Sequence, residues 1–286
     1  MTAKDLLERA AAEARRLGAD ATTWDARLLL AHVLDRRNPL GLDLRAAVEP
    51  ESEARFERLW SRRLTGVPVQ HLIGEWDFYG RTFRVDARAL VPRPETEILI
   101  TEALKDAPDA RRVLDAGTGC GIIGITFLLE RPRARAVALD ISVDALALAH
   151  ENAARHGVLG RLDLLASDWL SAIRPLPFDA LLSNPPYLAL GEAPHLPPTV
   201  RDHDPRRALF SGDDGLFAIR HLLETAPAYL AAGGLLVFEI GFGQGTAVEA
   251  EVRRRPAWEF RRIEPDLEGI PRIALAVRTP EPLPGA

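Results

Sequence analysis

The sequence is short of cysteine and of long apolar runs, and both shortages exclude classes of protein. Its 286 residues include one cysteine, Cys120, which excludes an internal disulfide bond and a cysteine-ligated metal cluster. No stretch approaches the ~20 consecutive apolar residues of a membrane-spanning helix. The N-terminal residues run straight into an amphipathic pattern and show no apolar signal core. We therefore expect a cytoplasmic protein that does not cross a membrane.

The chain is also short of positive charge. Its net charge is −5, and its only lysines are Lys4 and Lys105. Stable binding of nucleic acid normally requires an excess of basic residues, so we do not expect it here. The histidines show no metal-ligand spacing. We expect a monomer that binds no metal ion.

The N-terminal part of the chain has the pattern of a small helical bundle. Apolar residues recur at helical spacing between residues 6 and 17. Thr22 or Thr23 can cap a second helix, Pro39 interrupts the pattern, and a further helix follows from about Glu51. These segments predict three helices packed around a common core.

A β-hairpin is expected after this bundle. The segments 67–74 and 76–85 predict a hairpin that turns near Gly80. The change of pattern divides the chain into a helical domain of residues 1–75, a hairpin linker of residues 76–94, and a larger domain of residues 95–286.

Strands and helices alternate from residue 111 onward. Apolar runs predict strands at residues 112–116, 135–140, 162–166, 178–183, 234–240, 258–263 and 272–277. Helical patterns lie at residues 121–129, 143–156, 215–230 and 244–254, and a long, proline-rich loop at residues 188–213. Only a short turn joins the last two strands, so we expect them to be antiparallel neighbours. The pattern predicts an α/β fold with a doubly wound, mainly parallel sheet.

A rigid tetrapeptide, Asn184-Pro185-Pro186-Tyr187, follows the strand predicted at residues 178–183. Open α/β sheets bind ligands at this carboxyl edge. The side-chain carbonyl of Asn184 and the peptide carbonyl of Pro185 are two acceptors that suit a planar NH2 group, and Tyr187 can lie over its flat face. The alternative is a proline turn that only closes the strand. We predict that Asn184, Pro185 and Tyr187 are catalytic and that all four residues bind the substrate.

A glycine-rich loop follows the strand predicted at residues 112–116. Its glycines permit a tight turn and the close approach of backbone N–H groups to a ligand. Asp140 ends the next strand, near the ~20-residue offset of a carboxylate that binds ribose hydroxyls. Trp169 either lies beside an adenine ring or is a core aromatic residue. From these residues alone, the glycine-rich loop and Asp140 are the candidates for binding a cofactor.

Two cofactors satisfy the requirement for a glycine turn and an acidic residue at the ribose. A NAD-type dinucleotide is one, and S-adenosylmethionine is the other. The tetrapeptide favours S-adenosylmethionine, because it suits an NH2 group that accepts a methyl group and has no evident use in hydride transfer. Cys120 has no partner histidine in its motif, so we expect a small residue packed in the loop rather than a nucleophile.

Taken together, these motifs resemble the HemK/PrmC family, the N5-glutamine methyltransferases of peptide chain release factors. The resemblance covers nearly the whole chain. It rests on the helical N-terminal domain and on Gly74-Glu75, Phe78, Gly80, Pro92-Arg93-Pro94-Glu95-Thr96-Glu97, Asp115, Gly117-Thr118-Gly119, Gly121, Asn184-Pro185-Pro186-Tyr187, Glu239-Ile240-Gly241, Gln244, Asp266, Gly269 and Arg272. The sequence departs from the family at Asp204-Pro205 and at Gly212-Asp213-Asp214-Gly215, both after the tetrapeptide.

The resemblance implies a Rossmann-like, class I S-adenosylmethionine-dependent methyltransferase domain with a seven-stranded sheet. It implies that S-adenosylmethionine is converted to S-adenosylhomocysteine. The cofactor-binding residues that it implies are Gly117, Thr118, Gly119, Cys120, Gly121, Asp140, Trp169 and Asn184. The acceptor would be the glutamine of the Gly-Gly-Gln motif of a release factor, bound by residues 184–187, with the helical domain of residues 1–75 recognising this substrate.

Two other functions stay open at this point. Adenine-N6 DNA methyltransferases share the tetrapeptide, and a non-catalytic module can bind S-adenosylmethionine without turnover. Arg93 is either a solvated linker residue or a residue that lines a cleft.

Overall fold

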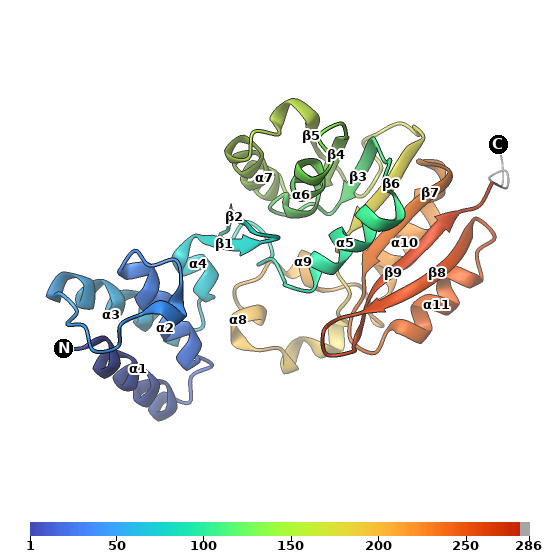
Figure 1. The fold of residues 1–286 in the computed structure, drawn as a ribbon. Helices are drawn as coiled ribbons and strands as arrows, with labels where there is room; N and C mark the ends of the chain where they lie inside the picture. Colours follow the sequence, from blue (N-terminus) through green and yellow to red (C-terminus); the bar gives the residue numbers. More distant parts are fainter. Residues whose placement is uncertain (281–286) are drawn as a thin grey trace. The chain divides into compact units, whose positions relative to one another are not determined.

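The computed structural model describes residues 1–280 and divides into two compact units (Figure 1). The first comprises Met1–Trp76, Val85–Ala87 and Pro194–Asp204; the second comprises Asp77–Arg84, Arg88–Ala193 and the chain from Pro205 onward. The last six residues of the predicted domain 95–286 lie outside the described residues. The assignment of separate functions to domains 1–75, 76–94 and 95–286 stays a prediction.

The first unit contains the helices expected from the N-terminal pattern. The expected helices are α1 (Ala3–Leu17), α2 (Thr23–Val33) and α3 (Pro50–Leu64). The unit also contains a 3-10 turn, η1 (Pro39–Gly41), and two short helices that were not predicted, α4 (Val69–Ile73) and α8 (Pro198–Arg201). Thr2 and Thr22 begin α1 and α2 through capping boxes in which each threonine pairs with the aspartate three residues later. Leu6, Leu29 and Trp60 are buried in one shared core. The three predicted helices are therefore confirmed.

A hairpin forms with its turn near Gly80, as predicted, but the strand predicted at residues 67–74 is wrong. β1 (Glu75–Phe78) and β2 (Arg81–Arg84) pair with each other. The turn that joins them consists of Tyr79 and Gly80, whose φ angles are 50° and 70°. Two positive φ angles are typical of the tight turn that joins twisted antiparallel strands. The segment 67–74 instead forms α4, because Val69 and Leu72 are buried at helical spacing and Gly74, with φ 79°, ends the helix.

The second unit is built on a seven-stranded sheet, in the order β5-β4-β3-β6-β7-β9-β8. Its strands are β3 (Arg112–Ala116), β4 (Arg135–Asp140), β5 (Leu162–Ala166), β6 (Phe178–Ser183), β7 (Leu230–Glu239), β8 (Trp258–Pro265) and β9 (Pro271–Arg278). Every ladder from β5 to β7 is parallel, whereas β9 pairs antiparallel with both β7 and β8. The predicted mainly parallel sheet, with antiparallel neighbours at its end, is confirmed.

Helices cover both faces of this sheet, as Figure 1 shows for the second unit. One face packs against α5 (Thr96–Asp106), α6 (Ile122–Glu130) and α7 (Val143–Arg155), and the other against α10 (Phe217–Thr225) and α11 (Gly245–Arg253). Because side chains alternate along a strand, Val113 belongs to the first core and Leu114 to the second. Burial on both faces explains why the central strands β3, β6 and β7 read as nearly continuous apolar runs rather than alternating ones.

Two predicted segments differ in detail from the structure. The helix predicted at residues 215–230 ends as α10 at Thr225 and continues as a 3-10 turn, η4 (Ala226–Ala228). Pro227 lies inside that turn and has no N–H to continue the helix, so β7 begins at Leu230. The loop predicted at residues 188–213 contains three short helices: η3 (Leu190–His195), α8 and α9 (Arg206–Leu209). Elsewhere in the chain, a 3-10 turn, η2 (Leu159–Arg161), precedes β5.

Asn152 on α7 ties the hairpin to the loop after β3. It is fully buried, its Oδ1 accepts from the N–H of Arg84, and its Nδ2 donates to the carbonyls of Arg84 and Cys120 at 3.0 and 2.9 Å. One side chain therefore satisfies three backbone groups on two separate segments.

We predict that Asn152→Ala lowers the free energy of unfolding by about 2–4 kcal/mol, because buried backbone groups lose their partners. Urea unfolding of the full chain measures this effect. The matched control is His150→Ala, which changes an exposed residue of the same helix and is expected to stay within about 0.5 kcal/mol. Equal stability of the two variants would contradict this role of Asn152.

Candidate active site

A cavity of 670 Å³ lies at the carboxyl ends of β3, β4, β5 and β6, within the second unit. Its volume is in the range of small-molecule sites, about 300–1,000 Å³. The strand order reverses between β3 and β6, and such a point is where open α/β sheets bind ligands. The lining residues are Arg88, Ala89, Leu90, Pro92, Thr96, Gly117, Thr118, Gly119, Cys120, Ile122, Ile123, Leu139, Asp140, Ile141, Ser142, Val143, Asp144, Ala145, Ser167, Asp168, Trp169, Asn184, Pro186, Pro205, Arg206, Arg207, Ala208 and Phe210.

The glycine-rich loop after β3 forms one wall of this cavity. Gly117 and Gly119 have φ angles of 74° and 55°, a left-handed conformation that glycine adopts without strain. The N–H groups of Gly117 and Thr118 donate to the carbonyl of Leu139 at the end of β4. The N–H of Gly119 donates to Oδ2 of Asp140 at 2.8 Å. The loop is therefore anchored to the neighbouring strand by its own backbone.

Asp140 lies where the sequence predicted a ribose-binding carboxylate. It ends β4, lines the cavity and is only half-buried. Its two oxygens accept one backbone N–H each, from Gly119 and from Ser142 at 2.8 and 2.9 Å. Each carboxylate oxygen has a further lone pair for a hydroxyl group of a ligand. The geometry suits a vicinal diol at this point.

Asp115 supports the same loop from beneath. It is fully buried, and its Oδ2 accepts from the Thr118 hydroxyl and from the N–H of Gly124 at 2.8 Å. Burial raises the pKa of Asp115 to about 6, since these two donors only partly offset the loss of water. A Cβ at position 124 would lie 2.9 Å from Oδ2, so a glycine is needed there.

Gly121 and Cys120 have different positions in the loop. Gly121 is buried and does not line the cavity; a Cβ there would lie 2.8 Å from Cδ1 of Ile125 and 3.0 Å from Cβ of Ala149. Gly121 therefore permits the close packing of α6 on α7. Cys120 is buried and lines the cavity, in keeping with a small residue packed in the loop.

Trp169 lies between the cavity and the core, and its place beside an adenine ring stays a prediction. It lines the cavity, and its ring packs against the core on the α10 face of the sheet. Its φ angle is 52°, which is uncommon for a bulky residue, and its ring centroid lies 5.7 Å from that of His221. The backbone turn after β5 thus directs this aromatic ring toward the cavity.

The tetrapeptide after β6 is fixed from several sides. The hydroxyl of Ser183, just before it, donates to the carbonyl of Ala116 at 2.7 Å, which joins the ends of β6 and β3. Asn184 and Pro186 line the cavity, whereas Pro185 is buried and neither Pro185 nor Tyr187 is among the lining residues. The carbonyl of Tyr187 accepts from Gln244 at 2.9 Å.

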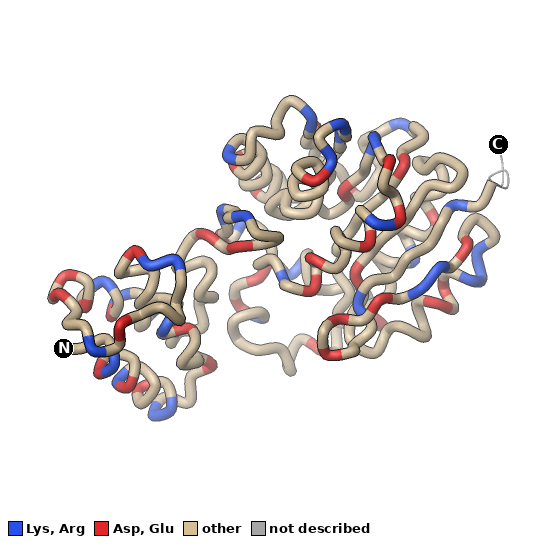
Figure 2. The backbone as a smooth tube through the Cα atoms, in the orientation of Figure 1, with Lys and Arg blue, Asp and Glu red and all other residues tan. Residues whose placement is uncertain are grey.

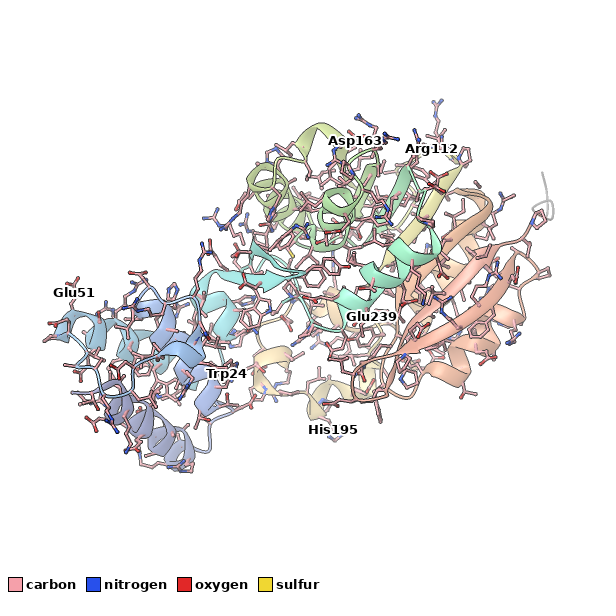
Figure 3. All side chains as sticks on the ribbon, in the orientation of Figure 1. Trp24, Glu51, Arg112, Asp163, His195 and Glu239 are labelled. Carbon is pink, nitrogen blue, oxygen red and sulfur yellow. The ribbon has the colours of Figure 1, made fainter. Side chains whose placement is uncertain are left out.

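A buried network connects this tetrapeptide to β7 and α5. Glu239, the last residue of β7, accepts from the Thr96 hydroxyl at 2.7 Å and from the Tyr187 hydroxyl at 3.4 Å. The side-chain N–H2 of Asn184 donates to the same Thr96 oxygen at 3.3 Å. In Figure 3, Glu239 lies toward the opposite edge of the sheet from Arg112 and Asp163, which mark the amino ends of β3 and β5.

Burial shifts the pKa of two groups in this network. It raises the pKa of Glu239 to about 7, with Glu95 adding to the rise and the hydroxyl of Thr96 and the charge of Arg272 opposing it. Burial and the carboxylate of Glu239 raise the pKa of Tyr187 above its usual range, while Arg93 and Arg272 oppose the rise. Tyr187 therefore keeps its proton at neutral pH.

Sequence reasoning missed several residues of this region. Thr96 and Glu239 entered only as members of motifs that resemble the family, and neither was given a role, although Glu239 lies near the end of an apolar strand. A carboxylate inside such a strand was the available signal, because a buried charge requires partners. In the two further lining segments, residues 88–92 and 205–210, only Pro92 and Pro205 belonged to a motif, and neither was given a role.

The residues present fit S-adenosylmethionine. The half-buried carboxylate of Asp140 matches ribose hydroxyls, Trp169 offers a flat aromatic surface for adenine, and the left-handed glycines keep the loop wall free of side chains.

Among residues 1–280, no group of three or more histidine, cysteine, aspartate or glutamate residues is arranged to hold a metal ion. Within the same part of the chain, no helix is both long enough and apolar enough to cross a membrane.

Comparison with known families gives two matches. Residues 94–195 match the family described as "Methyltransferase small domain", and residues 5–74 match the "PrmC N-terminal domain". Together with the doubly wound sheet and the cavity at its switch point, the first match defines an S-adenosylmethionine-dependent methyltransferase.

Full-length relatives give the family. The chain is 45% identical over 280 residues to the release factor glutamine methyltransferase of Cereibacter sphaeroides, covering 96% of this chain and 98% of that protein. It is 40% identical to that of Deinococcus radiodurans, over 97% of this chain and 99% of that protein. It is 37% identical to that of Moorella thermoacetica, over 98% of this chain and 100% of that protein. The chain belongs to the release factor glutamine methyltransferase family, as its motifs indicated.

Solved structures agree on the fold alone. A methyltransferase from Pyrococcus furiosus superposes with a TM-score of 0.52 at 16% identity, covering 71% of this chain and 91% of that one. A ribosomal protein L11 methylase from Lactobacillus delbrueckii subsp. bulgaricus superposes with a TM-score of 0.50 at 20% identity, covering 69% and 85%. Both support the Rossmann-like sheet.

We predict that Asp115→Asn reduces the pH dependence of stability. The pKa of Asp115 rises from 3.8 to about 6 on folding, so its contribution to stability is fully present below 3.8 and is lost as the pH rises through about 6. An asparagine does not titrate and lacks this loss. Urea midpoints of both proteins across that window measure the difference. Parallel curves for the two proteins would show that Asp115 titrates normally.

Proposed function

We propose that the chain transfers a methyl group from S-adenosylmethionine to the side-chain amide nitrogen of the glutamine in the Gly-Gly-Gln motif of peptide chain release factors. The observation that carries this proposal is the position of Asn184: its amide lies at the edge of the cofactor cavity, with its N–H2 group engaged by Thr96. Relatives named release factor glutamine methyltransferases, aligned along nearly the whole chain, support the choice of substrate.

The tetrapeptide orients the acceptor. A carboxamide nitrogen is a poor nucleophile, because its lone pair is delocalised into the carbonyl. The side-chain carbonyl of Asn184 and the backbone carbonyl of Pro185 accept its two N–H groups and direct the nitrogen lone pair at the methyl group. The same carbonyl dipoles favour the positive charge that develops on nitrogen. Alignment of this kind can supply up to about 7–11 kcal/mol in favourable systems.

S-adenosylmethionine supplies a methyl group on a positively charged sulfur, which makes the methyl carbon electrophilic. Transfer of this methyl group to the amide nitrogen would break its bond to sulfur and would release S-adenosylhomocysteine and one proton. Tyr187 keeps its own proton at neutral pH and cannot accept the one released, because its pKa is raised. We infer that the proton leaves to water after the methyl transfer.

The remaining parts of the proposal concern recognition. We assign the helical segment of residues 1–75 to the binding of the release factor; the match of residues 5–74 to the PrmC N-terminal domain and the exposed Trp24 on α2 support this (Figure 3). Acidic and basic residues are interspersed along the backbone (Figure 2), which agrees with a protein rather than a nucleic acid as substrate. We place the enzyme in the cytoplasm as a monomer, with its substrate.

Radiolabelled S-adenosylmethionine tests this function directly. It is offered side by side to a release factor, to the same factor with its Gly-Gly-Gln glutamine changed to alanine, and to duplex DNA. We predict label on the wild-type factor alone, because the site is built for a carboxamide.

Each other result would replace the proposal with a different one. Label on DNA would assign the tetrapeptide to an adenine amine. Label on both forms of the factor would move the acceptor away from the Gly-Gly-Gln motif. Cofactor binding without any label would indicate a non-catalytic module.

A further inference from the structure

Asn184 can present either of two chemically opposite ends to a ligand. Its side-chain amide has a carbonyl, which accepts hydrogen bonds, and an N–H2 group, which donates them. The proposed reaction needs the carbonyl to face the substrate, since two N–H2 groups cannot bond to each other through their donors. Whatever fixes the orientation of this amide therefore controls whether the site can function.

Within the described residues, the side-chain amide of Asn184 has one hydrogen-bond partner, Thr96. Its Nδ2 donates to the hydroxyl oxygen of Thr96 at 3.3 Å. A hydroxyl has one proton, so its direction depends on its other partner. That partner is Glu239, whose Oε2 lies 2.7 Å from the Thr96 oxygen. Thr96 and Glu239 are both buried, each with 2% of its surface exposed, so water does not compete for these bonds.

The charge of Glu239 decides the direction of the whole chain of bonds. An ionised carboxylate can only accept, so the Thr96 hydroxyl must donate to it. The Thr96 oxygen is then left as an acceptor, and only the N–H2 end of Asn184 can bond to it. The carbonyl end of Asn184 is thereby turned away from Thr96.

We propose that Glu239 is a positioning residue which, through the single proton of the Thr96 hydroxyl, holds the carbonyl of Asn184 toward the substrate. The proposal rests on the proposed function for its consequence in catalysis, but the bonding chain itself does not depend on the identity of the substrate. Glu239 touches neither substrate nor cofactor in this role.

Protonation of Glu239 removes the constraint. A protonated carboxyl can donate to Thr96, whose hydroxyl can then donate to the carbonyl of Asn184 and turn the amide around. The charged and titratable groups that face Glu239 are Glu95 before α5, Arg272 on β9 and Tyr187. Burial and the charge of Glu95 outweigh the charge of Arg272 and raise the pKa of Glu239 to about 7. Glu239 therefore gains and loses its proton close to neutral pH. Methyl transfer should therefore increase as the pH rises through this value.

The variants Thr96→Val and Thr96→Ser separate the hydroxyl from the shape of the side chain. Valine keeps the branched shape but cannot relay a proton, and serine keeps the hydroxyl. We predict that the valine variant lowers kcat about tenfold or more, as expected for the loss of one orienting hydrogen bond, while Kd for S-adenosylmethionine changes little. The serine variant should retain most of the wild-type kcat.

The pH profile of kcat identifies Glu239 as the group that controls the relay. The wild-type and Thr96→Ser proteins should show an acid limb with a midpoint near 7. Glu239→Gln and Thr96→Val should both lack it, because the first cannot titrate and the second cannot transmit the titration. An unchanged limb in either of these two variants would overturn the proposal, as would normal kcat in Thr96→Val.

The side-chain amide resonances of Asn184 give a readout that needs no methyl transfer. They are assigned in the ¹⁵N-labelled full chain by their absence from Asn184→Asp. They should shift with a midpoint near 7 in the wild-type protein and stay unchanged in Glu239→Gln and Thr96→Val. Such shifts without label on a release factor would disprove the proposed substrate and keep the relay, whereas label with no shift would disprove the relay alone.

Discussion

The structure depends on the pairing of polar groups at the carboxyl edge of its sheet, where five parallel strands end in a buried layer. Ser183 bonds across to the end of β3, Glu239 bonds to α5 and to the tetrapeptide, and Asp115 bonds to the glycine-rich loop. An unpaired polar group in such a place costs about 1–3 kcal/mol, so each of these bonds constrains the backbone around it. The cavity thus has walls that are fixed before any ligand arrives, which lowers the entropic cost of aligning two reactants.

The two halves of the site are supported in different ways. The wall formed by the glycine-rich loop depends on backbone conformation, because Gly117 and Gly119 are left-handed and their N–H groups bond to the end of β4. The tetrapeptide wall depends on three side chains: Glu239 at the end of β7, Thr96 at the start of α5, and Gln244 just before α11. A change in the side chains around the tetrapeptide therefore leaves the support of the glycine-rich loop in place.

The sequence predicted the sheet, its order of elements and the two walls of the cavity, because apolar runs and glycine turns are local signals. It could not predict the network around Glu239, since Thr96, Asn184 and Glu239 are far apart in the chain and are brought together only by the sheet topology. It assigned residues 67–74 to a strand because short apolar segments do not distinguish a strand from one helical turn. It gave no sign that Gly121 also permits the close packing of α6 on α7, because that contact is not local in the chain.

The central claim is that the side-chain carbonyl of Asn184 accepts the substrate amide, separately from cofactor binding. Asn184→Ala tests it when single-turnover methyl transfer and Kd for S-adenosylmethionine are measured on the same preparation. The account predicts that transfer falls by about 10²–10³-fold, as for the loss of one preorganised catalytic hydrogen bond, while Kd rises by less than about tenfold. Near-normal transfer by this variant would contradict the account.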